Sequence, residues 1–340
     1  MAGELKTIYN NQLIRTSTAD DTFTLACNGK LMASDVTIQA TDVDSLTVTY
    51  GGNTIATGSG TVTKILNCDG RVATSDIGVA VTMNSAPTEY FITFSSPDVF
   101  SLSVPTKGWD GTLQYSVNKS DWFTWDGTSI SSANLAGKQV LCLRGSGNTQ
   151  ISKSIPTRWI LVGSNISCEG NIETLLDYNT VSDGNHPTMA ASCFTYMFYN
   201  CTSLITPPSL PATTLAQSCY NNMFYNCKSL TTAPALPATT LANSCYKSMF
   251  RGCTSLTTLP SLPATILTTS CYEMMFSDCT LIKLSTTQTG EYQTAYRIPS
   301  SGTGTTALYA LELMFNGTGG SFAGKPTINT TYYTSNTVIS

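Results

Sequence analysis

The chain has 340 residues, of which 41% are hydrophobic and 11% are charged, and its formal net charge at pH 7 is −4. Soluble domains usually contain about a quarter charged residues, so this surface must be largely polar and uncharged. A nucleic-acid-binding protein needs a basic stripe, and the charge balance therefore disfavours that class. The length predicts two or three domains.

The first 21 residues contain no apolar segment of the kind found in export signals. No apolar run in the chain reaches the roughly 18 residues of a membrane span. We therefore expect synthesis in a cytoplasm without export, and no insertion into a membrane. The uncharged polar composition is nevertheless typical of β-rich extracellular or virion proteins. Virion proteins released by lysis satisfy both conditions, so the sequence favours a virion surface location.

The chain has twelve cysteines and one histidine, His186. No Cys-x-x-Cys pair is present, which disfavours a structural zinc site, and we expect neither a metal nor a cofactor. Cysteine behaves as a small hydrophobic residue in protein cores, so we predict buried free thiols. Disulfides between equivalent cysteines of neighbouring repeats are the alternative. His186 has no partner nucleophile in a motif, and no catalytic residue is predicted.

Residues 1–85 contain a duplication with an offset of 41 residues, and the copies lie at about 8–40 and 49–81. The clearest match aligns Cys27-Asn28-Gly29-Lys30 with Cys68-Asp69-Gly70-Arg71. Both copies consist of short alternating segments that are typical of β-strands. We predict that they form either one small β domain or two tandem modules.

The segment Tyr50-Gly51-Gly52-Asn53-Thr54-Ile55 and the cysteine turn after it resemble short β modules near the N-termini of phage tail and minor structural proteins. In such proteins the N-terminal end usually attaches a fibre to the particle. The resemblance therefore implies that residues 1–85 dock to other virion proteins. A spacer without a docking role is the alternative.

Residues 86–167 differ in composition and contain all four tryptophans. Alternating apolar segments recur about every ten residues between Gly, Asp and Asn turns, which indicates an immunoglobulin-like β-sandwich. Trp122 and Trp125 are three residues apart, so they point to opposite sides of an extended strand. Exposed aromatic rings bind sugars by apolar contact, and Trp125 is therefore a candidate binding residue. Packing in the core is the alternative.

Residues 168–340 are predicted to form a capped solenoid, because a 26-residue unit occurs four times within 192–279. Each unit has two cysteines, with a Phe or Tyr and a Met-Phe pair between them, and the first three units continue with Ser-Leu and a Pro-x-Leu-Pro-Ala-Thr linker. Ser192 and its equivalents precede the first cysteine, where a helix N-cap is expected. The i, i+3, i+4, i+7 spacing of one buried helix face is met by Phe194, Met197, Phe198 and Cys201.

Certain positions of the unit vary in residue type and are therefore predicted to be exposed. Counted from the first cysteine, offsets +2 and +6 would lie on one helix face, and offsets +3 and +7 are also free to meet a partner. A variable polar stripe on a fixed scaffold is typical of a binding surface, although an unselected surface has the same pattern. The candidate partner-binding residues are Thr195, Tyr199, Asn221, Tyr225, Lys247, Arg251, Glu273 and Ser277.

The segment Met197-Phe198-Tyr199-Asn200-Cys201-Thr202-Ser203-Leu204 resembles the BspA-like leucine-rich repeat, whose core is Ala-Phe-x-x-Cys-x-x-Leu. Met replaces Ala here, and the second half of the unit is longer and richer in proline. The resemblance implies solenoid coiling. We therefore expect a multidomain, mainly β chain: a duplicated small β module, an immunoglobulin-like β-sandwich and a C-terminal leucine-rich-repeat solenoid with short helices.

The order of these parts resembles a group of gut-phage structural proteins that join a docking module and a sandwich to BspA-like repeats. This resemblance implies a non-enzymatic virion surface protein, a fibre or adhesin, whose solenoid binds glycans or proteins of the host surface. It also implies a homo-oligomer, a trimer by analogy with other phage fibres.

Two other non-enzymatic functions are the alternatives: a fibre or decoration protein of the capsid head, and a bacterial cell-surface or secreted adhesin. A depolymerising enzyme is disfavoured, because glycosidases need two opposed carboxylates and the repeats contain few.

Overall fold

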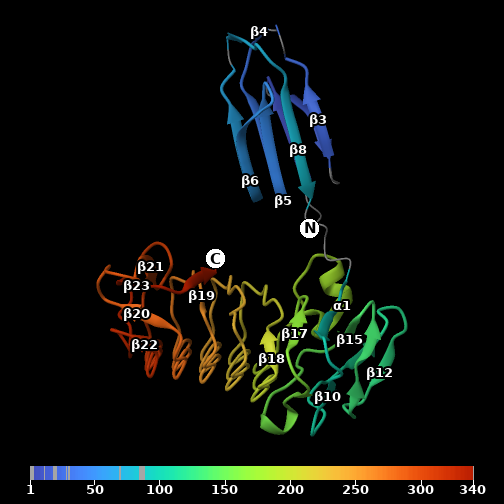
Figure 1. Cartoon of the computed structure of the whole chain (residues 1–340), viewed down its shortest axis with the longest axis vertical. Coiled ribbons are helices and arrows are strands. Elements are labelled where there is room, and N and C mark those ends of the chain that lie inside the picture. Colours follow the sequence, from blue (N-terminus) through green and yellow to red (C-terminus); the bar gives the residue numbers. More distant parts are fainter. Residues whose placement is uncertain are drawn as a thin grey trace. The chain divides into compact units, whose positions relative to one another are not determined.

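The computed structural model describes residues 4–10, 12–17, 21–27, 29, 31–68, 70–83 and 89–339. The chain divides into two compact units, Met1–Thr88 and Glu89–Ser340 (Figure 1). Strands in several sheets dominate the described residues, which contain one α-helix, α1 (Thr174–Ser182). The prediction of a mainly β chain is confirmed.

The first unit contains a six-stranded antiparallel sheet and a two-stranded pair, β4–β7. The order in the larger sheet is β2-β1-β5-β8-β3, and β6 also pairs with β5. The strands of this unit are β1 (Glu4–Tyr9), β2 (Gln12–Ser17), β3 (Asp21–Leu25), β4 (Leu31–Met32), β5 (Val36–Tyr50), β6 (Asn53–Leu66), β7 (Arg71–Val72) and β8 (Ile77–Met83).

The two sequence copies are interlocked in this sheet and are not arranged in tandem. Within each copy the register is the same, since Leu5 pairs with Ala40 in the first copy and Leu46 with Val81 in the second. However, β3 of the first copy pairs with β8 of the second, and the equivalent end of β6 pairs with the start of β5. Each copy therefore completes the strand pairing of the other.

Two aspartates connect the copies in the same reciprocal way. The Cys68 backbone N–H donates to Asp35 Oδ1 at 2.8 Å, and the Cys27 N–H donates to Asp76 Oδ1 at 2.6 Å. The duplication therefore forms one structural domain, the first of the two arrangements that the sequence allowed. Three residues of the matched motif lie outside the described residues, namely Asn28, Lys30 and Asp69.

The second unit begins with two sheets that share one core. The larger has the order β12-β11-β15-β9-β17-β18 with β14 on β15, and the smaller has the order β13-β10-β16. Leu102 of β10 and Leu141 of β15 are both fully buried in this core. The strands are β9 (Ile92–Ser96), β10 (Ser101–Ser103), β11 (Thr112–Ser116), β12 (Phe123–Trp125), β13 (Ile130–Ser131), β14 (Ala133–Leu135), β15 (Lys138–Ser146) and β16 (Ile160–Val162), with a 3-10 helix, η1, at Ile155–Thr157.

The larger sheet and the core continue into the repeats. β17 (Ile166–Glu169) pairs in parallel with β18 (Leu204–Thr206), which belongs to the first repeat. The Trp159 ring packs edge-on against Phe198 with 6.0 Å between centroids. The sequence boundary between residues 167 and 168 therefore falls inside one compact unit.

The repeats do not contain the expected helices, and this prediction was wrong. Residues 192–200 form consecutive tight turns, and the same is true of the equivalent residues in the next three coils. Every fourth residue has a positive φ, as at Ser192 (63°), Tyr196 (60°) and Asn200 (61°). Left-handed residues at this interval are incompatible with an α-helix. Ser192 and its equivalents therefore occupy left-handed turn positions and are not helix caps.

Backbone N–H groups of each coil alternate between two kinds of partner. Phe194, Tyr196 and Phe198 donate to carbonyls of the next coil, at 2.9, 3.0 and 2.9 Å. Between them, Thr195 and Met197 donate to the carbonyl three residues earlier in their own coil. The pattern repeats in the following coils. Each turn is thus closed within its coil and also bonded to its neighbour.

Equivalent aromatic rings stack along the interior of the array. Successive rings of one row are nearly parallel, with 5.4 to 5.6 Å between centroids; its members are Phe198, Phe224, Phe250, Phe276 and Phe315. Phe315 belongs to a fifth coil, residues 309–317, which lacks the cysteines but keeps positive φ at Tyr309, Leu313 and Gly317. The array therefore has one more coil than the sequence repeat.

Both ends of the array are covered. At the first coil, the segment before α1 pairs with the repeat, since the Ile172 N–H donates to the Ser209 carbonyl at 3.1 Å. At the other end, residues after Cys279 form the sheet β21-β23-β20-β22, and β24 pairs in parallel with β19 of the third repeat unit. Their strands are β19 (Thr258–Pro260), β20 (Lys283–Ser285), β21 (Thr294–Arg297), β22 (Gly319–Gly320), β23 (Thr331–Thr334) and β24 (Thr337–Ile339).

We predict that Phe250→Ala destabilises the second unit by about 3–5 kcal/mol, because it removes the central ring of the buried row. Thr254→Ala, in the same coil but exposed, is the matched control and should change stability by less than about 0.5 kcal/mol. All four tryptophans lie in this unit, so fluorescence during urea unfolding measures both effects. Equal midpoints for the two variants would contradict the buried row.

Candidate interaction surfaces

The positions at offsets +2 and +6 do not form a uniformly exposed stripe. Thr195 and Ser277 are buried, with exposed fractions of 5% and 2%, so the prediction that they are exposed was wrong. Thr195 is buried because its hydroxyl donates to the Ser218 carbonyl of the next coil at 2.6 Å. The other six candidates are half-buried and reach the surface with part of their side chains: Tyr199, Asn221, Tyr225, Lys247, Arg251 and Glu273.

Trp125 is also buried, with 2% of its surface exposed, and cannot stack on an external sugar. Its ring stacks on Trp109 at 5.2 Å and meets Trp159 edge-on at 5.6 Å. The indole N–H donates to the Thr128 carbonyl at 2.8 Å. The selection of Trp125 as a binding residue was therefore wrong, and core packing is its role. Phe123, two residues earlier in β12, is the exposed aromatic residue of this strand.

The outer rows of the array, defined here as offsets +2, +3, +6 and +7, begin with an aromatic patch. The rings of Tyr199 and Tyr225 are stacked with 5.0 Å between centroids, and Tyr196 meets Tyr199 edge-on at 5.5 Å. The Arg251 guanidinium lies 5.7 Å from the Tyr225 ring centroid. These contacts hold the tyrosine rings in fixed orientations, as a recognition surface requires.

Charged pairs follow the aromatic patch in the third and fourth coils. Lys247 Nζ lies 3.0 Å from Glu273 Oε2, and Arg251 Nε lies 3.3 Å from Asp278 Oδ2. Each carboxylate is thus paired with a cation on the preceding coil. The outer rows therefore offer stacking rings and hydrogen-bonding groups that suit binding.

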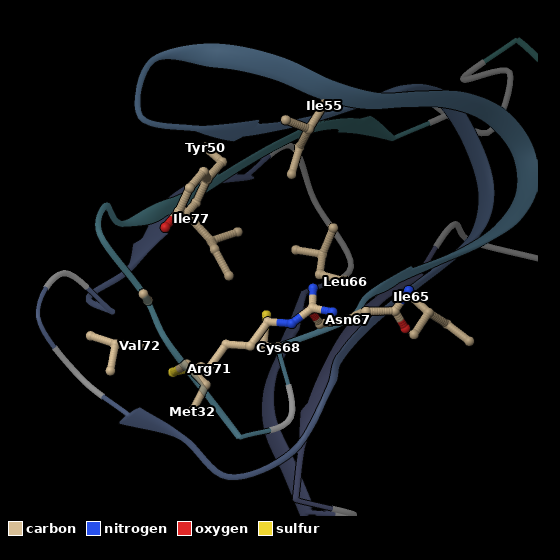
Figure 2. Close-up of a pocket in the computed structure, with 11 residues that line it drawn as sticks. Met32, Tyr50, Ile55, Ile65, Leu66, Asn67, Cys68, Arg71, Val72 and Ile77 are labelled. Atoms are coloured by element: carbon tan, nitrogen blue, oxygen red, sulfur yellow. The ribbon is translucent and has the colours of Figure 1, made fainter.

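The first unit has an apolar pocket of about 400 Å³ lined by residues of β4 to β8 (Figure 2). Ile55 and Leu66 of β6 and Ile77 of β8 face it, and Tyr50 and Arg71 add polar groups. The sequence predicted docking by residues 1–85 without a particular binding residue. Two residues of the pocket could nevertheless have been selected, because Tyr50 and Ile55 are the first and last residues of the segment that resembles phage tail β modules.

The repeat cysteines are buried free thiols, as predicted. The second cysteine of each unit donates its S–H to a backbone carbonyl of the preceding coil or segment; the acceptor carbonyls are those of Trp159, Phe198, Phe224 and Phe250, at 3.3, 3.0, 3.0 and 2.9 Å. Burial raises the pKa of Cys271 to about 11 and that of Cys201 and Cys279 to about 12. These thiols are therefore structural hydrogen-bond donors.

Within the described residues, no group of three or more His, Cys, Asp and Glu side chains is placed to hold a metal ion. No described helix is long and apolar enough to cross a membrane. No family model matches the chain, and no curated protein and no solved structure matches it significantly.

We predict that the repeat cysteines resist alkylation in the native protein at pH 8. An unperturbed thiol has a pKa of about 8.5, and raising that pKa in the fold keeps the thiol protonated and unreactive. Because the pKa of each buried thiol is higher in the folded than in the unfolded protein, burying the neutral thiol stabilises the fold fully below the pKa of the unfolded thiol. This stabilisation is lost as pH rises above that value and through the folded-state pKa. Mass spectrometry of iodoacetamide-labelled peptides measures the reactivity, with urea-unfolded protein as the control. Native labelling of Cys227 or Cys253 at the unfolded rate would contradict the buried thiol rows.

Proposed function

We propose that the chain is a non-enzymatic surface protein of a phage virion, a fibre or adhesin. In this proposal the first unit docks to other virion proteins, and the repeat array binds glycans or proteins of the host surface. The array would be a variant of the BspA-like leucine-rich-repeat solenoid, and residues 86–167 an immunoglobulin-like sandwich that supports it. The phage origin rests on the resemblance in the order of parts, and the homo-oligomeric state rests on analogy with other phage fibres.

The observation that carries this proposal is the contrast between inner and outer rows of the array. Inner positions repeat the same residues, which stack at nearly constant spacing. Outer positions change from Tyr and Asn in the first two coils to paired charges in the next two. A rigid backbone that presents different side chains in register is suited to recognising an extended partner.

The docking role of the first unit is supported by its apolar surface. The pocket in Figure 2 has exposed walls at Ile55, Ile65 and Val72. Exposed apolar groups around a concave pocket are typical of protein contact sites. The interlocked pairing of the two copies provides a rigid base for such a contact.

We expect purified full-length chain to bind surface extracts or glycans from at least one gut bacterium, and the double variant Tyr199→Ala/Tyr225→Ala to bind at least about ten-fold more weakly. The loss follows from removing the stacked aromatic patch, which is largely a surface feature. Phe123→Ala, which removes an exposed ring outside the array, is the matched control and should bind like the unmodified chain. A glycan array and biolayer interferometry measure these affinities.

Unchanged binding by the double tyrosine variant would contradict the assignment of the outer rows. Release of oligosaccharide fragments from a bound polysaccharide would contradict the non-enzymatic proposal.

A further inference from the structure

Glu173 is a buried carboxylate whose hydrogen bonding is incomplete. Only 1% of the residue is exposed, and its Oε1 atom has no hydrogen-bond partner. Its Oε2 atom lies 2.7 Å from Nδ1 of His186, the single histidine of the chain. A buried carboxylate oxygen without a donor is costly, because the atom has lost its hydration without replacing it. Such an atom needs an explanation, and a donor from outside the protein is one that a neighbouring pocket would allow.

Glu173 and His186 line a pocket of about 470 Å³ in the second unit. This volume is within the range of small-molecule sites. One part of the lining is apolar and comes from Pro187 and Met189, and a second wall comes from residues 212–216, at the end of the first repeat linker. Thr213 and Thr214 place two exposed residues with hydroxyl groups at this second wall.

The pocket exists because the array ends here. The linker of the second repeat is covered on this side by the linker of the first repeat, because Thr240 pairs with Thr214. The first linker has no preceding coil, and the segment around α1 covers it only in part, through the bridge between Asn171 and Ser209. A recess between the cap and the first coil is the result.

The chemistry of the pocket favours a neutral ligand with hydroxyl groups. Oε2 of Glu173 is already in hydrogen-bond contact with His186, which leaves Oε1 as the acceptor for a ligand, and no Lys or Arg lines the pocket to attract an anion. A carboxylate oxygen accepts hydrogen bonds from hydroxyl groups, while the Pro187, Met189 and Leu215 side chains offer apolar contact. A sugar ring has hydroxyl groups at its edge and C–H groups on its faces, and matches both requirements.

We propose that the recess between α1 and the first repeat linker is a binding site for a neutral sugar ring, with Glu173 as the hydrogen-bond acceptor. Burial raises the pKa of Glu173, and hydrogen bonding to the side chains of His186 and Asn171 acts in the opposite direction. The site is separate from the outer rows of the array, so it goes beyond the proposed function and is tested independently of it.

The test is titration of the chain with three probes: galactose, N-acetylglucosamine and, as a cationic probe, choline. Saturation-transfer NMR measures the binding of each probe. We expect at least one of the two sugars to bind at millimolar concentration, and choline not to bind. Glu173→Gln keeps the side-chain size and should weaken sugar binding about ten-fold, because it replaces a charged acceptor. Glu169→Gln, an exposed carboxylate outside the pocket, is the matched control and should bind as the unmodified chain does.

A second variant covers the possibility that Glu173→Gln disturbs folding. Thr214→Trp fills the recess from an exposed position and should abolish sugar binding while leaving the unfolding midpoint unchanged. Binding of neither sugar, binding of choline in their place, or equal binding by the Thr214→Trp variant would each overturn the proposal. None of these outcomes affects the test of the outer rows, because the Tyr199→Ala/Tyr225→Ala variant leaves the recess intact.

Discussion

The structure of the second unit depends on how the repeats divide their backbone hydrogen bonds. In an α-helix every N–H bonds within the same segment, and a nine-residue helix would be only marginally stable alone. Here alternate N–H groups bond within the turn and to the next coil, so no coil is complete without its neighbour. Stacking is therefore built into the backbone, and identical side chains come into register as a consequence. The aromatic row and the thiol donors to neighbouring carbonyls both follow from this register.

The sequence predicted the buried positions of the repeat correctly but not the backbone that places them. Successive side chains rotate about the axis of an α-helix by about 100° per residue, and about the axis of a ribbon of four-residue turns by about 90°. Over eight residues, the side-chain directions in the two structures therefore differ by only about 80°. The apolar spacing of Phe194, Met197, Phe198 and Cys201 fits both. Residue types at the turn positions contained the missing information. Offset +7 is Asn, Asn, Gly and Asp in the four units, and these are the residues that tolerate positive φ.

Other features of the fold could not be obtained from local patterns. The matched copies in residues 1–85 revealed the duplication, but the exchange of strands between them is a long-range pairing that no short motif encodes. Trp125 was a surface candidate because alternation gives two faces without saying which one is covered. Its packing against Trp109 and Trp159, which are distant in the sequence pattern of that strand, decides the question. Glu173 was part of an unremarkable cap segment, and its pairing with His186 appears only when the loop after α1 folds back.

The two surfaces of the second unit follow from the same array. Along its length, the turns fix side chains in rows and allow the outer ones to vary without disturbing the core. At its first coil, the end of the stacking leaves a recess that the cap only partly covers. An array with a variable face and an unsymmetrical end therefore has two separate surfaces, and these are the two binding sites that we propose.

The repeat array depends most directly on its left-handed turns, and a pair of substitutions at Asn200 tests them. Asn200 is exposed and has a φ of 61°, so both substitutions remove the same side-chain contacts. In a left-handed position, Gly should give a protein about 1 kcal/mol more stable than Ala, because only Ala is strained there. In a helix the order is reversed by about 1 kcal/mol. Urea unfolding of Asn200→Gly and Asn200→Ala should therefore show the glycine variant to be more stable, and a more stable alanine variant would contradict the turn ribbon.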